Sequence, residues 1–331
     1  MSVLSVRDLS VTYSTEGGPV PAVRGVDIEI GRGQVLGLAG ESGCGKSTIA
    51  HALMRLLPTG TEVGGTISLN GKDVLSMTPR QLKAVRWTEA SIVFQGAMHA
   101  LNPVLRVSDQ IAEAIQAHAQ AGRRESMIRV GELLEQVGLP PRRMKDYPHE
   151  FSGGQRQRVM IAMALACSPD LIVADEPTTA LDVMVQAQVL RLLKDLQRDL
   201  GLAMLFVTHD LSVLAEVSDR LAVMYAGKIV EDGPARQVFL DPRHPYTKAL
   251  ADAFPEIGDD RFLQAPTGLG GDPPDPQFIP SGCSFHPRCP LAFDACPTTE
   301  PALYRAGEGR RAACLLVDED TVHAGAEHEH A

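Results

Sequence analysis

The chain has 331 residues and a mass of 35.6 kDa, enough for about two domains of average size. Hydrophobic residues make up 44% of it and charged residues 22%, which excludes a disordered, collagenous or small disulfide-stapled protein. The formal net charge of −10 has the wrong sign for a protein that coats nucleic acid. No apolar run approaches the roughly 18 residues of a membrane-spanning helix. Arg7 and Asp8 interrupt the apolar core that a secretion signal needs, so we expect an unexported chain with reduced thiols.

Strand signals dominate the first 40 residues, where apolar residues alternate or bunch and turn formers separate them. A helix-like stretch follows from Ser47 to Leu57, and strand signals return at 65–69 and 91–95. Between Val107 and Gln136, apolar residues recur every three or four positions, which predicts a helical insert.

Two continuous apolar runs, at 171–175 and 203–209, are short enough for buried parallel strands. A helix from about Val183 to Leu200 is expected between them, so strand, helix and strand predict a doubly wound α/β core. Past Gly233, prolines accumulate and periodicity fades, which predicts a separate, loop-rich appendage beginning near Asp241. The acidic, histidine-bearing end of the chain is expected to be a solvated tail.

The sequence GESGCGKST, at residues 40–48, follows a strand pattern and opens a helix, which is the context of a P-loop. Its glycines let backbone amides wrap around phosphate oxygens, and Lys46 adds a full positive charge at the helix N-terminus. Ser47 is expected to hold Mg²⁺, and Cys44 is interpreted as a spacer in the loop instead of a nucleophile. A glycine-rich turn with a solvated lysine is the alternative.

Acidic residues end the first of the two apolar runs, in the sequence LIVADEP. They predict Asp175 beside the metal and Glu176 next to the γ-phosphate, where it accepts a proton from attacking water. A helix cap is the alternative for these two acids.

In FSGGQRQR, Ser152 caps a further helix whose glycines leave its first amides open to an anion.

With these motifs in order, the chain resembles the nucleotide-binding subunits of ABC transporters over residues 1–235. Walker A is GESGCGKST, Walker B is LIVADE and the signature is FSGGQ, with Phe151 where that family more often has Leu. The resemblance implies four further residues: Tyr13 stacking on adenine, Gln95 in the Q-loop, Asp182 in the D-loop and His209 as the switch histidine.

The fold implied is an α/β P-loop NTPase with an N-terminal antiparallel β subdomain and a helical insert. Two such domains sandwich two ATP molecules, with Mg²⁺ held by Ser47, Gln95 and Asp175, and catalysis assigned to Glu176, His209 and Gln95. The ATP-binding residues implied are Tyr13, Gly40, Ser42, Gly43, Cys44, Gly45, Lys46, Ser47 and Thr48. The residues implied to act on the partner's ATP are Ser152, Gly153, Gly154 and Gln155.

The sequences RHPYTKAL and GCSFHPRCPLAFDAC look like the C-terminal extension of dipeptide and oligopeptide importer ATPases, a group that includes nickel and some oligosaccharide importers. The domains expected are an ATPase domain at 1–240, with its helical subdomain at about 96–166, a C-terminal extension at 241–316 and a tail at 317–331. The implied partners are a sister ATPase chain, two membrane permeases and, indirectly, an extracytoplasmic binding protein, with no nucleic acid. The implied location is the cytoplasmic face of the cell membrane, as a peripheral subunit.

Four cysteines lie in the extension, separated by five, six and seventeen residues: Cys283, Cys289, Cys296 and Cys314. Four thiolates suit either tetrahedral Zn²⁺ or a [4Fe-4S] cluster, and a disulfide pair is a third possibility. Some members of the importer group carry such a cluster, so the resemblance favours iron-sulfur over zinc. Bound metal would stabilise a segment too poor in apolar residues to form its own core.

Soluble ABC ATPases of DNA repair, translation or iron-sulfur assembly are the alternatives in another functional class. Repair members carry long coiled coils between Walker A and the signature, but only about a hundred residues lie between them here. Translation factors carry two cassettes in one chain, and this sequence has one. The RHPYTKAL sequence argues against iron-sulfur assembly.

Overall fold

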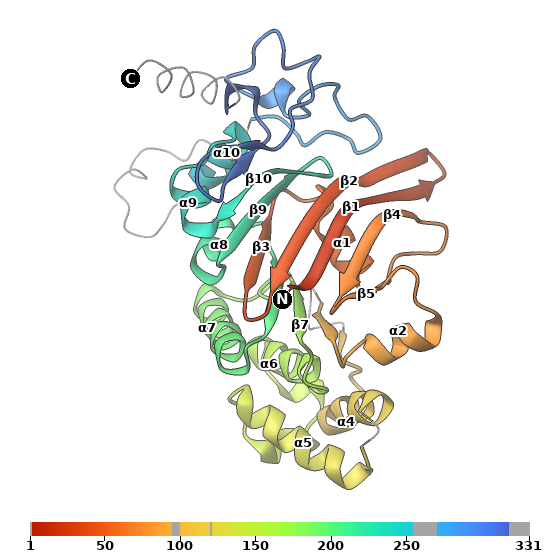
Figure 1. Ribbon diagram of the computed structural model, residues 1–331. Coiled ribbons are helices and arrows are strands. Elements are labelled where there is room, and N and C mark those ends of the chain that lie inside the picture. Colours follow the sequence, from red (N-terminus) through yellow and green to blue (C-terminus); the bar gives the residue numbers. More distant parts are fainter. Residues whose placement is uncertain (1, 95–99, 120, 254–269, 318–331) are drawn as a thin grey trace.

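A computed structural model describes residues 2–94, 100–119, 121–253 and 270–317 (Figure 1). Two β-sheets form its core, one of four strands in the order β2-β1-β4-β5 and one of eight in the order β11-β12-β10-β9-β3-β8-β7-β6.

The strands are β1 Ser2–Thr15, β2 Gly18–Gly31, β3 Val35–Ala39, β4 Glu62–Leu69, β5 Lys72–Asp73, β6 Ala90–Val93, β7 Leu171–Asp175, β8 Ala203–Val207, β9 Arg220–Tyr225, β10 Lys228–Pro234, β11 Tyr304–Arg305 and β12 Arg311–Ala312. The α-helices are α1 Lys46–Leu53, α2 Pro79–Val85, α4 Val107–His118, α5 Arg123–Gln136, α6 Gly153–Ala164, α7 Val183–Leu200, α8 Leu211–Val217, α9 Ala235–Leu240 and α10 Pro245–Ala253. Short 3-10 helices are η1 Pro141–Lys145, η2 Pro148–Glu150 and η4 His286–Arg288.

The four-stranded sheet is antiparallel and consists of the strand-rich N-terminal segment. Its long strands β1 and β2 alternate buried apolar and exposed polar residues, as expected for a sheet with one face on a core. The buried face packs with α1 and with one face of the larger sheet in a shared apolar cluster. The antiparallel β subdomain implied by the sequence is therefore present.

Parallel pairing organises the centre of the eight-stranded sheet. Strand β3 pairs in parallel with β8, and β8 pairs in parallel with β7. All five residues of each strand are buried, which explains why they read as continuous apolar runs. The predicted unit of strand, helix and strand is confirmed, with α7 between β7 and β8.

Helices of the predicted insert pack together on the far side of the molecule from the C-terminal extension (Figure 1). Helices α4 and α5 contact each other and α6, and their apolar faces join the second large apolar cluster. That cluster covers the face of the large sheet that the N-terminal sheet does not cover.

The C-terminal extension is not the separate appendage that the sequence predicts. Strand β12 pairs with β10, so the extension continues the large sheet. Phe285 and Tyr246 are buried within the same apolar cluster as the helical insert, and the buried Arg310 pairs with the fully buried Glu231 of β10 at 3.1 Å. The segment has too few apolar residues for a core of its own, and it obtains one by sharing that of the ATPase domain.

Replacing Phe285 tests this shared core. Its ring lies 5.3 Å from that of Tyr225 on β9 and 5.4 Å from that of Tyr246, and it is 1% exposed. We expect Phe285→Ala to lower the free energy of unfolding of the whole chain by about 3–5 kcal/mol, measured by urea denaturation. Phe278→Ala is the control, because Phe278 is 76% exposed and its loss should change stability by no more than about 0.5 kcal/mol. An unchanged core transition in Phe285→Ala would show that the extension is independent after all.

Candidate functional site

The phosphate loop connects β3 to α1 and depends on glycines. Gly40 has φ 149° and Gly45 has φ 109°, a region that favours glycine. A Cβ atom at Gly40 would lie 2.3 Å from the carbonyl oxygen of Met224, and one at Gly45 would lie 2.3 Å from that of Ala22. These positions therefore need glycine both for conformation and for space.

Lys46 begins α1 and lies inside the loop, with 5% of its surface exposed. Its ammonium group donates to the carbonyl oxygens of Gly40 at 2.7 Å and Glu41 at 2.8 Å. The loop thus curls around a buried cation, next to the N-terminus of a helix, which is an arrangement that attracts anions. Cys44 is also buried, and burial raises the pKa of its thiol, which agrees with its interpretation as a spacer.

Two oxygen-bearing side chains meet beside this loop. Ser47 donates its hydroxyl to Oδ1 of Asp175, 3.1 Å away, although they are far apart in sequence. Parallel pairing accounts for the meeting, because β3 and β7 flank β8 and end at the same edge of the sheet. A hydroxyl and a carboxylate side by side fit the oxygen ligands that Mg²⁺ prefers. Asp175 is 3% exposed, and burial raises the pKa of its carboxyl group.

Glu176 and His209 lie together at the same edge of the sheet. The backbone of Glu176 has φ 45°, and its amide donates to the carbonyl oxygen of Val207 at 2.8 Å. Its carboxylate accepts a hydrogen bond from Thr179 at 2.9 Å and lies 3.4 Å from Nδ1 of His209. A carboxylate fixed in this way is suited to accept a proton from a water molecule.

The remaining implied ATP contacts are distributed over other elements. The hydroxyl of Tyr13 donates to Thr48 at 3.1 Å, so this aromatic side chain stands near the start of α1. Ser42 and Gly43 lie on the loop itself. Gln95 lies outside the described residues.

The signature sequence forms the start of α6, as predicted. Ser152 and Gln155 form a reciprocal capping box, and Gly154 packs so closely on α7 that a Cβ atom would lie 2.3 Å from Val185. Asp182 caps α7. Helix α6 packs on α4, α5, α7 and β6, whereas α1 packs on β2 and β7, so the two anion-attracting helix N-termini are anchored to different parts of the chain.

All four cysteines of the extension line one small cavity, which also contains His244 and His286. The six cysteines of the chain are free thiols, so the structure gives no support for a disulfide pair. Burial, followed by neighbouring cysteines, raises the pKa of Cys283 to about 11. Among residues 2–94, 100–119, 121–253 and 270–317, no group of three or more His, Cys, Asp or Glu side chains is arranged to hold a metal ion. The four cysteine side chains line one cavity, but their sulfur atoms would have to move closer together to bind one metal centre.

Contacts between the extension and the phosphate loop were not predicted from the sequence. The carboxylate of Glu41 accepts a hydrogen bond from Arg288, and its amide donates one to the hydroxyl of Tyr246; both partners are more than two hundred residues away. Tyr246 and Arg288 lie in the RHPYTKAL and HPRC sequences, but neither sequence indicates a contact with Glu41.

Comparison with known proteins agrees with this geometry. A family model described as "ABC transporter" matches residues 23–179, and one described as "Oligopeptide/dipeptide transporter, C-terminal region" matches residues 230–296. The oligopeptide transport ATP-binding protein OppD of Salmonella typhimurium is 45% identical over 95% of this chain and 93% of its own length. The chain belongs to the ABC transporter ATP-binding subunits.

Other relatives of this ABC subunit support the same assignment. The dipeptide transport ATP-binding protein DppD of Bacillus subtilis is 42% identical over 97% of both chains. The dimeric structure of the bacterial ABC transporter cassette MJ0796 superposes with a TM-score of 0.62 at 29% identity, covering 70% of this chain and 99% of that one. Within the described part of the chain, no helix combines the length and the apolar character needed to cross a membrane.

Replacing the buried Asp175 by Asn should stabilise the protein at neutral pH. Because burial raises the pKa of Asp175, its carboxyl group stays protonated in the folded chain at pH values where the unfolded chain has lost that proton. The charged carboxylate therefore opposes folding at neutral pH, and this penalty vanishes as the pH falls below the ordinary value of 3.8. We expect Asp175→Asn to unfold at higher urea concentration than the wild type at pH 7, with the difference shrinking towards pH 4.

Asp182→Asn is the matched control for this experiment. Asp182 is exposed, and asparagine caps a helix about as well as aspartate, so its stability should not change. Lower stability of Asp175→Asn at pH 7 would contradict the electrostatic argument.

Proposed function

We propose that this chain binds and hydrolyses ATP to power the import of dipeptides or oligopeptides through a membrane permease. The observation that carries the proposal is the meeting of Lys46, Ser47, Asp175 and Glu176 at one edge of the sheet. The peptide cargo rests on the printed names of the relatives, DppD and OppD, which match nearly the whole chain. Nickel and oligosaccharides are the alternative cargoes.

ATP joins two subunits in this proposal. Backbone amides of the phosphate loop and the charge of Lys46 bind its phosphates on one chain, and Tyr13 stacks on the adenine. Ser152, Gly153, Gly154 and Gln155 at the N-terminus of α6 contact the same ATP from the partner chain. Two opposed helix N-termini neutralise charge that neither satisfies alone, so ATP holds the dimer together and its hydrolysis releases it. The separate anchoring of α1 and α6 supports an ATP site shared between chains.

Hydrolysis is assigned to Glu176. The oxygen of a water molecule bonds to the γ-phosphorus, its proton passes to the Glu176 carboxylate, and the bond to the β–γ bridging oxygen breaks to release ADP. His209, 3.4 Å from Glu176, orients the water and contacts the γ-phosphate. Ser47, Asp175 and Gln95 would hold Mg²⁺, which would neutralise the charge that develops on the phosphate.

The partners proposed are a second ATPase chain, two permease subunits and, indirectly, an extracytoplasmic binding protein that delivers the cargo. The helical insert α4–α5 is the surface proposed to face the permease, and the subunit would then lie at the cytoplasmic face of the membrane. Apolar side chains are exposed at Val104, just before α4, and at Ile128 on α5, with 75% and 58% of their surfaces accessible.

The four-cysteine cavity is proposed to bind a metal cofactor, with a [4Fe-4S] cluster preferred and Zn²⁺ as the alternative. The proposal is supported by the position of all four cysteines in the lining of one cavity, since both cofactors accept four sulfur donors once the sulfur atoms move together. The core shared with the ATPase domain already stabilises the extension, so metal is not its only source of stability.

Replacing Glu176 by Gln tests the proposed function. The amide cannot take a proton from water, so we expect ATP binding to remain and steady-state ATPase activity to fall by about 10²–10⁴-fold. Uptake of labelled dipeptides and longer peptides by the complex with its permease should fall in parallel. Lys46→Ala is the control that loses ATP binding itself. Normal ATP turnover in Glu176→Gln would place the base elsewhere, and co-purification with ribosomes or cluster scaffolds in place of a permease would favour the soluble alternatives.

Metal analysis of anaerobically purified protein tests the cysteine site. We expect iron and acid-labile sulfide in equal amounts, with visible charge-transfer absorption, and their loss in Cys296→Ser. Cys167→Ser should retain the metal, because Cys167 lies outside the cavity. Colourless protein with one zinc per chain would overturn the iron-sulfur assignment, and protein with neither metal would overturn both.

A further inference from the structure

The C-terminal extension contacts the phosphate loop at one residue from two directions. Glu41 directly follows Gly40 in the loop, and its amide donates to the hydroxyl of Tyr246 at 2.8 Å. Its carboxylate receives both terminal nitrogens of Arg288, at 2.7 and 2.9 Å. These two residues come from the RHPYTKAL and HPRC sequences that distinguish the extension.

Arg288 is held firmly in this position. Its side chain is 6% exposed, and its Nε donates to the carbonyl oxygen of Gly270 at 3.0 Å. The guanidinium carbon lies 5.9 Å from the ring centres of both Tyr225 and Phe285. A buried, bidentate pair of arginine and carboxylate fixes direction as well as distance, which a lysine does not do.

Glu41 is also hydrogen-bonded to Lys46, the lysine proposed to bind ATP. Its carbonyl oxygen accepts a hydrogen bond from Lys46, so the same residue is tied to the extension by its side chain and amide and to Lys46 by its carbonyl. A cavity of about 280 Å³ lies beside this contact, and it is lined by Glu41, Ser42 and Gly43 of the loop and by Pro273 and Pro276 of the extension. The extension therefore contacts the loop at Glu41, and a cavity lies beside this contact.

We propose that Arg288 is a positioning residue that, through Glu41, holds the phosphate loop in its ATP-binding conformation. The inference rests on the proposed ATPase function and deepens it, because it makes the extension part of the nucleotide site. A loop ordered before binding loses less conformational entropy when the triphosphate arrives. Loss of the pair therefore weakens ATP binding more than it slows hydrolysis at saturating ATP. Arg288 is followed directly by Cys289, so the Arg288–Glu41 pair connects the phosphate loop to the cysteine cavity.

The test compares ATP affinity among full-length variants by calorimetry, with KM and kcat measured in parallel. We expect Arg288→Gln to raise the Kd and KM for ATP about tenfold, with kcat changed less than twofold, and Arg288→Lys to fall between it and the wild type. Glu41→Gln should weaken ATP binding to a similar extent. The double variant, Arg288→Gln with Glu41→Gln, should weaken it no further, because both single changes remove the same ion pair.

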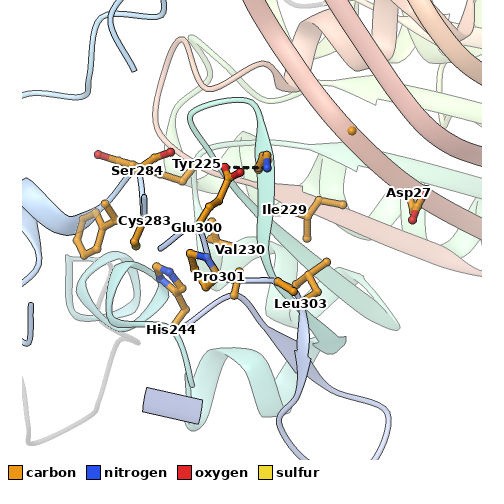
Figure 2. Close-up of a pocket in the computed structure, with 15 residues that line it drawn as sticks. Asp27, Tyr225, Ile229, Val230, His244, Cys283, Ser284, Glu300, Pro301 and Leu303 are labelled. Carbon is orange, nitrogen blue, oxygen red and sulfur yellow. Dashed lines mark ion pairs between the residues drawn. The ribbon is translucent and has the colours of Figure 1, made fainter. Parts of the chain in front are cut away.

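Lys228→Gln is the matched control. Lys228 forms an ion pair with Glu300 at 2.7 Å, beside a cavity of about 170 Å³ between β10 and the extension, where Figure 2 marks the pair with a dashed line. Its side chain thus ties the extension to the ATPase domain through Glu300 and not through Glu41, although the preceding residue, Gly227, donates its amide to the carbonyl oxygen of Cys44 in the phosphate loop at 3.0 Å. ATP affinity should be unchanged in this variant even if its melting temperature falls.

Several outcomes separate the proposal from its premise. Unchanged Kd and KM in Arg288→Gln, or an equal loss in Lys228→Gln, would show that Arg288 only tethers the extension. If Arg288→Gln does not fold, Arg288→Lys and Glu41→Gln decide the question by the same criterion. Wild-type protein that binds ATP no better than Lys46→Ala would refute the proposed ATPase function itself, and not only the role of the Arg288–Glu41 pair.

Discussion

Parallel pairing of β3 and β7 on either side of β8 is the constraint on which the site depends. It brings the carboxyl ends of three strands to one edge of the sheet, and the residues proposed to form the ATP site lie at or just after the end of each strand. Lys46 follows β3, Asp175 ends β7 and His209 follows β8. A slip of one residue in any of these pairings would turn a functional side chain to the opposite face of the sheet.

Burial on both faces of the sheet gives this edge its rigidity. The N-terminal antiparallel sheet covers one face, and the helices from α4 to α10 cover the other. The site contains charged groups that a buried position disfavours, such as Lys46 and Asp175. A raised pKa at Asp175 and a left-handed backbone at Glu176 are costs to stability that the surrounding core offsets.

The extension shows how a segment without a core of its own becomes ordered. It adds β11 and β12 to the large sheet, inserts Phe285 and Tyr246 into the apolar cluster, and buries Arg310 against Glu231. Its packing places Arg288 on the phosphate loop and the four cysteines, among them the adjacent Cys289, around one cavity. The extension, the cysteines and the loop therefore form one continuous structure.

The sequence alone determined the phosphate loop, the acidic strand end and the capped signature helix, because each is a local pattern with its own turn or cap requirement. It also determined β7, α7 and β8, whose apolar runs are set by burial on both faces of a parallel sheet. Only the tertiary structure decided that the extension shares the main core, that Ser47 meets Asp175, and that Arg288 reaches Glu41. Those contacts join residues more than a hundred positions apart, and no local spacing encodes which distant side chain fills a given space.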